Sequence, residues 1–408
     1  MDFLYLSYSE NIQMDIVIIG AGIAGLTAAY RVSQYNPHAS CMIIEKEADI
    51  GGRIQYDSFF GEEMKMGGGI LRREDIETQR LLDELGIPYH FSRHDIQYVN
   101  KPVDIIDFIL KTRRLYTKNP PPFGTTFKEY AINVWGVDIY NHFLESNMYI
   151  DFENSSAYEI LFNNDFNYNT DGFMEGRVEW NKLIEALYTR IPYPIYVNCA
   201  CTQLHKVKDG YIIDTSHGVS IATRKVIIAV PAKAIDALLP GMGYNYLLES
   251  PAIKVYAKAT KRSAVILEKY VPIHTIVSGP LHNIIPIHPK KGIYLIGYSD
   301  EDEAKQISSI SDDTPQHRQQ FARLVEHALH LKQGSIVFEK IHSRYWTNAM
   351  HVNHASIRSL STFLYRLQRP FPLIRVVGEA VNDSHGWIGS AIDSVNTVIT
   401  KNWVNNID

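Results

Sequence analysis

The sequence has few cysteines, little excess charge and no long apolar run. Its 408 residues include three cysteines, Cys41, Cys199 and Cys201, with no CxxC pair and no Cys/His metal spacing. This excludes a disulfide framework and favours a reducing compartment, so we expect a cytoplasmic protein. A formal net charge of −5 gives no general attraction to nucleic acid or to an anionic membrane.

Signals for targeting or anchoring are also missing. No apolar run approaches the ~20 residues of a membrane-spanning helix. The opening MDFLYLSYSENIQ lacks a basic start and a long apolar core, so we interpret it as a short extension and not a signal peptide. An apolar fraction of 45% and a charged fraction of 21% are typical of a soluble globular protein, and the length favours two domains.

The stretch from residue 15 to residue 53 carries the strongest pattern. An apolar strand at 15–19 leads into Gly20-Ala21-Gly22-Ile23-Ala24-Gly25, a helix follows, and a second strand at 41–44 ends on Glu45. This order of strand, glycines, helix, strand and acid is the βαβ fingerprint for a dinucleotide. We expect Glu45 to accept hydrogen bonds from a ribose diol.

Each glycine of this loop has a predicted task. Gly20 makes the tight turn, Gly22 lets the backbone approach a pyrophosphate, and Gly25 lets the helix pack closely on the strand. The helix N-terminus offers N–H groups and a partial positive charge to the phosphate. The alternative is a Rossmann-like fold without a nucleotide.

The rest of the chain alternates between strand and helix patterns. Expected helices lie at 74–85, 103–112, 127–135, 137–147, 157–162, 179–189, 232–239, 314–331 and 388–404. Expected strands lie at 54–60, 62–66, 96–99, 201–207, 211–215, 225–230, 252–260, 274–279, 292–298, 335–341 and 373–377. We interpret 91–180 as a mostly helical insertion.

This order predicts an α/β fold in which one domain is interrupted by another. A Rossmann-like FAD-binding domain takes residues 14–90, 176–240 and 370–408. A substrate-binding α+β domain with a mixed sheet takes residues 91–175 and 241–369.

Blocks spread over the chain resemble the flavin-containing amine oxidase family. They are VIIGAGIAGLTAAY…IIEKEADIGGR, MKMGGGIL with ETQRLLDELGI, CTQLHKVKDGYIIDTSHG…ATRKVIIAVP, SPAIKVYAKATKR, Tyr345-Trp346 and VVGEAVNDSHGWIGSAIDS. The resemblance covers the nucleotide-binding segments well and the insertion at 91–180 poorly. It implies FAD as the cofactor, held non-covalently, since relatives with covalent FAD use a cysteine beyond the Trp346 position.

The resemblance also implies which residues hold FAD. Beside the glycine loop and Glu45, these lie after the second strand, beside the flavin ring, at the adenosine side and near the C-terminus: Ala24, Lys46, Gly52, Arg53, Gly68, Gly69, Ile70, Cys201, Gly378, Glu379 and Ile388. The alternatives are an ordinary turn at Gly67–Ile70, a surface ion pair for Arg53, and a small buried side chain at Cys201.

Lys254 is the one catalytic side chain that the resemblance implies, with an ammonium that holds a water against flavin N5. From strand alternation alone, a solvated lysine is the favoured interpretation. Trp346 and Trp387 would wall an aromatic site for the amine, or else are core tryptophans. His351 and His354 have HxxH spacing, but without nearby carboxylates we expect no metal site.

The chain departs from the family pattern at four positions. Glu47 replaces a frequent arginine and Lys65 a frequent acid. Ser390 and Val395 stand where glycines are usual in the last helix, whose N-terminus should point at the flavin pyrimidine.

The expected function is amine oxidation, with hydride transfer from an amine C–H to flavin N5 and reoxidation by O₂ to H₂O₂. Small-molecule amine and O₂ are the expected partners, with no nucleic acid and no membrane. The alternatives are an FAD-dependent desaturase or protoporphyrinogen-oxidase-like enzyme, or a flavoprotein that keeps FAD without amine turnover.

Overall fold

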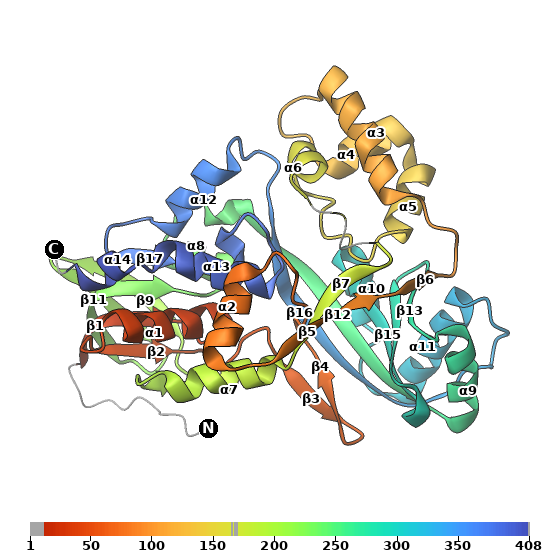
Figure 1. The fold of residues 1–408 in the computed structure, drawn as a ribbon, viewed down its shortest axis with the longest axis horizontal. Helices are drawn as coiled ribbons and strands as arrows, with labels where there is room; N and C mark the ends of the chain where they lie inside the picture. The colour runs from red at the N-terminus through yellow and green to blue at the C-terminus, as the bar shows by residue number, and fades with distance from the viewer. Residues whose placement is uncertain (1–11, 165, 167–169, 407–408) are drawn as a thin grey trace. The chain divides into compact units, whose positions relative to one another are not determined.

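The computed structural model describes residues 12–164, 166 and 170–406 (Figure 1). The chain forms two compact units. Unit 1 comprises Met1–Ser92, Glu175–Leu248 and Arg358–Asp408, and unit 2 comprises Arg93–Met174 and Glu249–Ile357. The N-terminal extension expected at 1–13 lies mostly outside the described residues.

The sheet of unit 1 has the order β8-β2-β1-β11-β10-β9, and β17 also pairs with β11. The pairs β1–β2, β1–β11, β2–β8 and β11–β17 are parallel, whereas β9, β10 and β11 pair antiparallel. The predicted Rossmann-like α/β fold is therefore confirmed. The strands are β1 Ile12–Ile19, β2 Cys41–Ile44, β8 Ile195–Tyr196, β9 Cys201–Val207, β10 Gly210–Thr215, β11 Ser220–Ile228 and β17 Ile374–Val376.

Both faces of this sheet are covered, because its central strands are apolar on both sides. In β1, Ile16 and Ile18 belong to one core cluster and Val17 and Ile19 to another. The first cluster packs against α1, α7 and α13, and the second against α8 and α12. The helices are α1 Ile23–Tyr35, α2 Ile76–Leu85, α7 Trp180–Arg190, α8 Ala232–Leu238, α12 Leu360–Gln368, α13 Ile388–Val398 and α14 Lys401–Asn405, with short 3₁₀ turns at Tyr244–Tyr246 and Glu379–Val381.

A small hairpin, β3 Tyr56–Phe59 and β4 Glu62–Lys65, follows the first βαβ segment. Phe60 and Gly61 both have positive φ at its turn, 53° and 76°, as a tight two-residue hairpin requires.

Unit 2 contains a six-stranded mixed sheet of order β16-β12-β15-β14-β13-β6, as predicted. The pairs β12–β15, β14–β15 and β13–β14 are antiparallel, and β13–β6 is parallel. The strands are β6 Ile96–Tyr98, β12 Leu247–Ala259, β13 His274–Ile276, β14 Asn283–His288, β15 Ile293–Asp300 and β16 Phe338–Asn353. The helices are α3 Ile105–Lys118, α4 Phe127–Trp135, α5 Val137–Glu145, α6 Ala157–Phe162, α9 Lys261–Tyr270, α10 Glu301–Ser308 and α11 Pro315–Ala328, with a 3₁₀ turn at Pro289–Lys291.

Several expectations for single elements were wrong. The segment 91–180 is mostly helical as predicted, but β7 Phe173–Val178, which forms a two-stranded sheet with β5 Tyr89–His94, was not expected. The last helix is broken into α13 and α14, since the Thr400 side chain caps a new helix by accepting from the Trp403 N–H. Ile76, expected on the buried face of its helix, is exposed. The elements α9, α10, α12 and β14 were not predicted.

Candidate dinucleotide and active site

The glycine loop between β1 and α1 shows why two of its glycines are needed. A Cβ on Gly20, which has φ +104°, would lie 2.5 Å from the Ala229 carbonyl oxygen. A Cβ on Gly25 would lie 1.9 Å from the Gly20 carbonyl oxygen. Close approach of the helix to the strand therefore accounts for Gly25, as predicted from its position in the fingerprint.

Gly22 is different, because the protein itself does not need a glycine there. The nearest atom to a Cβ on Gly22 would be the Gly52 Cα at 3.9 Å. Gly22 is the N-cap of α1, and no side chain caps this helix. The helix thus begins beside a space that a side chain would partly fill, which fits a pyrophosphate held by backbone N–H groups. The buried Ala24 lies in the first turn.

Glu45 is buried at the end of β2, with 8% of its surface exposed. Its Oε2 accepts from the Ala21 N–H at 2.7 Å, and its Oε1 accepts from the Glu47 N–H at 2.9 Å. The carboxylate therefore ties the glycine loop to the loop after β2. Each oxygen keeps a second lone pair, so the group can also accept from ribose hydroxyls.

The loop after β2 contains Glu47, one of the positions that depart from the family pattern. Lys46 and Glu47 form an exposed ion pair, with Nζ and Oε1 3.1 Å apart. Cys199 donates its N–H to the Glu45 carbonyl, which brings the segment before β9 next to β2. Cys201 follows at the start of β9, and burial raises the pKa of its thiol to about 12, so the thiol stays protonated and unreactive.

Arg53 and Glu379 bring the two ends of the sequence together. Arg53 Nη1 lies 2.7 Å from Glu379 Oε1. Glu379 Oε2 accepts from the Gly386 N–H at 3.1 Å, and its side chain is buried. Gly378 precedes it with φ +128°. The loop after β2 and the loop after β17 therefore meet at one ion pair, at the carboxyl end of a parallel sheet in which β1 and β11 lie between these two strands. This is the edge where α/β folds bind ligands.

The glycine triplet packs against the same loop. A Cβ on Gly67 would lie 1.7 Å from the Arg53 carbonyl oxygen, which explains this glycine by protein contacts alone. Gly68 is exposed, donates its N–H to that oxygen at 3.1 Å, and lies against Ile388. Gly69 lies against the Lys65 side chain, and Ile70 is half-buried. Burial lowers the pKa of Lys65.

Arg72 and Asp75 form a buried ion pair that the sequence pattern did not reveal. Arg72 Nη2 lies 2.7 Å from Asp75 Oδ1, and both residues are 7% exposed. Arg72 Nη1 donates to Ser384 Oγ at 2.9 Å, and its guanidinium lies 4.6 Å from the Trp387 ring centroid. One face of Trp387 is thus covered by a cation. The motif R-x-x-D before a helix was the available signal.

The first turn of α13 lies against this pair. A Cβ on Gly389 would lie 2.2 Å from Asp75 Oδ1, so only glycine fits there. The neighbouring Ser390 is 2% exposed, and its hydroxyl has no hydrogen-bond partner among the residues that the structure describes. Both residues line a cavity of about 250 Å³. Val395 is fully buried in the core with α1.

Lys254 lies in unit 2, on strand β12. It is directly opposite Tyr298 in the antiparallel pair of β12 and β15, and its Nζ lies 4.7 Å from the Tyr298 ring centroid. Lys254 is half-buried. Burial, followed by the charge of Asp300, raises the pKa of the Tyr298 phenol, which therefore stays neutral.

Trp346 also belongs to unit 2, in β16, and is half-buried. The Arg344 guanidinium lies 4.7 Å from its ring centroid. The two histidines of the HxxH spacing differ in their surroundings. His351 is fully buried, and His354 Nδ1 accepts from the Ser356 N–H at 3.2 Å. Within the described residues no group of three or more His, Cys, Asp or Glu side chains is arranged to hold a metal.

Beside Tyr298, unit 2 buries an acidic group that the sequence pattern did not single out. Asp300 ends β15 and is 4% exposed; its Oδ2 accepts from the Ile150 N–H at 3.1 Å. Desolvation and the nearby Asp151 raise the pKa of Asp300 well above its ordinary value. His282, 2% exposed, lies 3.1 Å from Glu303; although desolvation opposes it, that carboxylate raises the pKa of His282.

Comparison with solved structures establishes the fold of the whole chain. Wild-type putrescine oxidase bound to putrescine matches with a TM-score of 0.73 at 15% identity, over 95% of this chain and 98% of that chain. A triple variant of the same enzyme gives a TM-score of 0.74 with the same identity and coverage. A structure assigned as a protoporphyrinogen oxidase from Exiguobacterium sp. 255-15 gives 0.69 at 13% identity, over 97% and 100%. The chain has the fold that these proteins share.

Sequence comparisons match the nucleotide-binding part. The family described as "NAD(P)-binding Rossmann-like domain" matches residues 18–85. A thiamine thiazole synthase of Aeropyrum pernix is 32% identical over 89 residues, which is 22% of this chain and 29% of the relative. The chloroplastic thiamine thiazole synthase of Arabidopsis thaliana is 29% identical over 124 residues, 30% and 32%. The matched segments thus span about a third of these curated relatives. No described helix is long and apolar enough to cross a membrane.

Proposed function

We propose that this chain is an FAD-dependent amine oxidase that binds FAD non-covalently in unit 1 and its substrate through unit 2. FAD, when bound, supplies a hydride acceptor at N5 for an amine C–H and passes the electrons to O₂, which gives H₂O₂. Water then hydrolyses the resulting imine. The protein supplies binding, orientation and electrostatics.

The residues of unit 1 fit the two halves of FAD. The α1 N-terminus beyond Gly22 suits the pyrophosphate, and Glu45 suits the adenosine ribose, with the Cys201 and Lys46 backbone near the adenine side. Arg53, Gly378 and Glu379 are the proposed contacts between the pyrophosphate and the flavin. Gly52, Gly68, Gly69, Ile70 and Ile388 are the proposed neighbours of the flavin and ribityl chain.

Lys254 is the proposed catalytic side chain. Its ammonium lies over the neutral Tyr298 ring, which restrains it without neutralising it. A fixed cation of this kind can hold a water in place and stabilise negative charge that develops nearby. Trp346 and Trp387 are the proposed aromatic contacts of the amine. Because an arginine covers one face of each ring, only the remaining faces and edges are offered to substrate.

The observation that carries the proposal is the Arg53–Glu379 ion pair beside the Gly22 loop. It connects two of the segments that resemble the amine oxidase family, the one that contains Gly22 and Arg53 and the one that contains Glu379. The similarity in fold to putrescine oxidase over 95% of the chain supports the choice of an amine.

An anaerobic titration with a panel of mono-, di- and polyamines tests the proposal. We expect yellow protein whose flavin absorbance bleaches on addition of one class of amine and returns with air. Flavin that no amine bleaches, although dithionite does, contradicts amine oxidation. In that case two residues of α13 favour a flavoprotein without amine turnover: Ser390, whose buried hydroxyl has no partner among the described residues, and the bulky Val395. A desaturase or protoporphyrinogen-oxidase-like reaction would instead require that a substrate oxidised at a carbon–carbon bond bleaches the flavin.

Acid precipitation tests the non-covalent attachment. We expect the flavin in the supernatant, and flavin that stays with the precipitated protein contradicts the proposal.

A further inference from the structure

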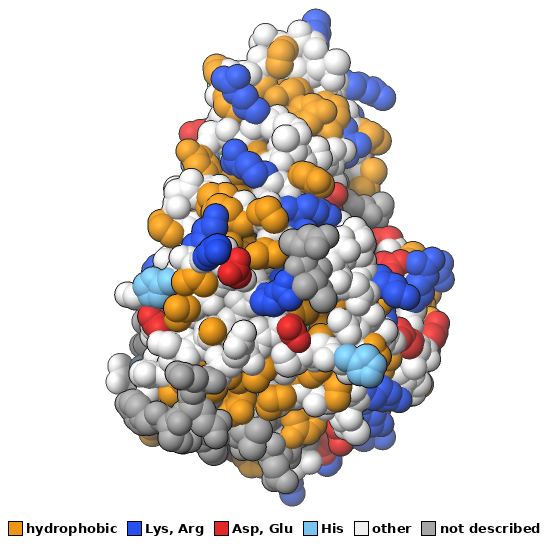
Figure 2. Space-filling model, turned by 90° about the vertical axis from the view of Figure 1, so that its left-hand side faces the viewer, with side chains coloured by type: hydrophobic (Ala, Val, Ile, Leu, Met, Phe, Trp, Pro, Cys, Tyr) orange, Lys and Arg blue, Asp and Glu red, His pale blue; other side chains and the backbone are white. Residues whose placement is uncertain are grey.

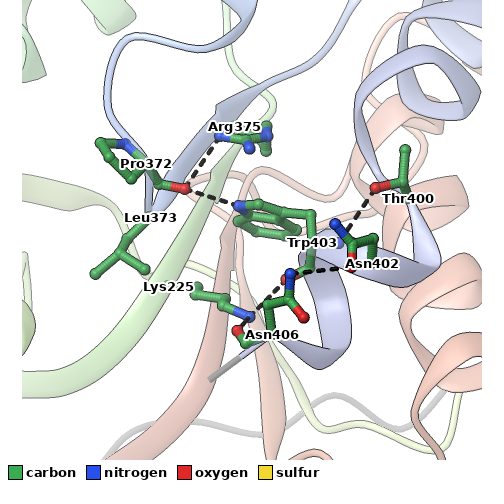
Figure 3. A pocket seen from close by; sticks show the side chains of 8 residues that line it. All are labelled: Lys225, Pro372, Leu373, Arg375, Thr400, Asn402, Trp403 and Asn406. Atoms are coloured by element: carbon green, nitrogen blue, oxygen red, sulfur yellow. Dashed lines mark hydrogen bonds between the residues drawn. The ribbon is translucent and has the colours of Figure 1, made fainter. Parts of the chain in front are cut away.

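Unit 1 contains a cavity that is separate from the dinucleotide loop and is lined by basic and polar side chains. Its volume is about 270 Å³. It lies where the end of α14 meets β11 and the loop before β17 (Figure 3). The lining residues include no acid: Lys225, Pro372, Leu373, Arg375, Thr400, Asn402, Trp403 and Asn406.

Lys225 brings a buried charge to this cavity. It is 6% exposed, and its Nζ donates to the carbonyl oxygens of Trp403, Val404 and Asn406 at 2.6, 3.1 and 2.6 Å. These bonds use all three N–H groups of the ammonium, so Lys225 offers positive potential and no further hydrogen bond. Neutral carbonyls satisfy its donors, but they leave its charge unbalanced.

Arg375 is the second cation that lines the cavity. Its Nη1 donates to the carbonyl oxygens of Phe371, Pro372 and Ile374 at 3.2, 3.2 and 2.8 Å. Its Nε is buried and has no acceptor among the residues that the structure describes. Buried charged groups in proteins are normally paired. Arg375 is half-buried and makes no ion pair with a described acid, so its contribution to the cavity is an unbalanced positive charge.

Trp403 lies between the two cations in Figure 3. Its ring centroid is 5.2 Å from Lys225 Nζ and 4.9 Å from Arg375 Cζ, and its Nε1 donates to the Pro372 carbonyl. The ring keeps both cations at the cavity without neutralising them.

The surrounding charges are also mostly positive. Arg224 and Arg369 act on Lys225 and Arg375 respectively, and desolvation followed by Arg369 lowers the pKa of Arg375 to about 10, which leaves it charged at neutral pH. Among the described residues, Asp15 is the acid that acts on Lys225, and it accepts hydrogen bonds from Ser40. On the face of the molecule shown in Figure 2, Lys and Arg side chains are interspersed with Asp and Glu side chains.

We propose that the cavity between Lys225 and Arg375 binds the phosphate group of a small phosphomonoester. Two cations match a dianionic group, and a planar guanidinium matches two of its oxygens. The Asn402 and Asn406 amides and the Thr400 hydroxyl are the neighbouring polar groups. The cavity is larger than a phosphate group alone needs, which leaves space for an organic part beside Leu373 and Pro372.

Calorimetric titration of the full-length protein with glycerol 3-phosphate and, separately, with inorganic phosphate tests this site. We expect saturable binding of both, tighter for the phosphomonoester, and weaker by at least about tenfold in Arg375→Gln, because a charge-assisted bidentate contact is lost. Arg375→Lys keeps the charge, so we expect intermediate binding. Lys208→Met removes an exposed cation of the same unit and should bind like the unaltered protein.

A second variant separates this site from the dinucleotide loop. Gly22→Val fills the space before α1, so binding that survives in Gly22→Val and is lost in Arg375→Gln belongs to the cavity. Binding that is lost only in Gly22→Val, binding equal in Arg375→Gln and the unaltered protein, or no saturable binding at all overturns the proposal. None of these outcomes depends on amine turnover.

Discussion

At the scale of single residues, the glycine loop contains one glycine that helix packing requires and one that only a bound ligand would require. Gly25 and Gly22 lie three residues apart, yet a Cβ would meet a backbone oxygen at 1.9 Å on the first and nothing closer than 3.9 Å on the second. We predict that Gly25→Ala destabilises the protein by about 2 kcal/mol or more through overpacking. Gly22→Ala should leave the unfolding free energy nearly unchanged. Urea denaturation without added FAD measures both.

FAD affinity provides the complementary measurement for the same pair. Gly22→Ala should bind FAD more weakly although it is folded, because its methyl group reaches toward the proposed pyrophosphate position. Equal stability losses in the two variants would show that the contacts at Gly25 are relieved by movement of the helix.

Lys254 provides a second prediction at this scale. Lys254→Met should slow reaction of the reduced flavin with O₂ by about 10²-fold, because a fixed cation near the reacting atoms is lost. Lys258→Met is the matched control, since Lys258 lies four residues further on the same strand and donates to the Lys291 carbonyl. Stopped-flow reoxidation after dithionite reduction measures the rate without any amine. Similar rates in both variants would exclude the role of Lys254.

At the scale of elements, the Arg72–Asp75 pair connects the start of α2 to the start of α13. Removing one partner of a buried pair leaves the other charge uncompensated. We predict that Asp75→Ala lowers the unfolding free energy by about 3 kcal/mol. Glu74→Ala should change it by less than about 1 kcal/mol, because Glu74 is half exposed and 3.7 Å from Arg72. Chemical denaturation of both variants tests the difference.

The elements that the sequence predicted well are those with complete local signals. The strand at 41–44 and the helices at 127–135 and 157–162 have the predicted bounds. Thr126 and Glu129 form a capping box at the second of these, and Gly86 ends α2 in the left-handed conformation. The dinucleotide fingerprint belongs to the same class, because all its parts lie within forty residues.

The elements that were missed depend on contacts remote in sequence. The apolar residues of α13 and α14 continue one pattern through Ile399, and only the Thr400 cap reveals the break. β7 owes its place to pairing with β5, some eighty residues earlier. In the same way, Arg53 was predicted to bind a cofactor, but its partner Glu379 lies 326 residues away. A local sequence pattern contains no information on which residues so far apart will form a pair.

At the scale of the whole molecule, buried titratable groups set how stability depends on pH. Desolvation and Asp151 raise the pKa of Asp300 above the 3.8 of an ordinary aspartate. The folded state therefore binds a proton that the unfolded state has released above about pH 4, and stability falls as pH rises through this window. The slope from this group is at most about 1.4 kcal/mol per pH unit. His282, raised by Glu303, acts in the same direction near neutral pH.

We predict that Asp300→Asn removes part of this dependence, so its stability relative to the unaltered protein increases between about pH 5 and about pH 7.5. Asp302→Asn is the control without a pH-dependent difference in this range, because a hydrogen bond from Lys305 lowers the pKa of the exposed Asp302 below its ordinary 3.8 and the group is ionised in both the folded and the unfolded state. Thermal unfolding across this range tests both. A relative stability of Asp300→Asn that does not change with pH would contradict the prediction.

The strand order of unit 1 has a consequence for synthesis on the ribosome. β11 pairs along one edge with β1 and along the other, at its carboxyl half, with β17, which is residues 374–376 of 408. The partner of Arg53 follows at residue 379. All of unit 2 is translated before these residues. The nucleotide site, although its fingerprint precedes unit 2 in the chain, therefore becomes complete only after all of unit 2 has been translated. A ribosome-bound chain that ends before residue 374 lacks part of its central sheet and the anion that balances Arg53.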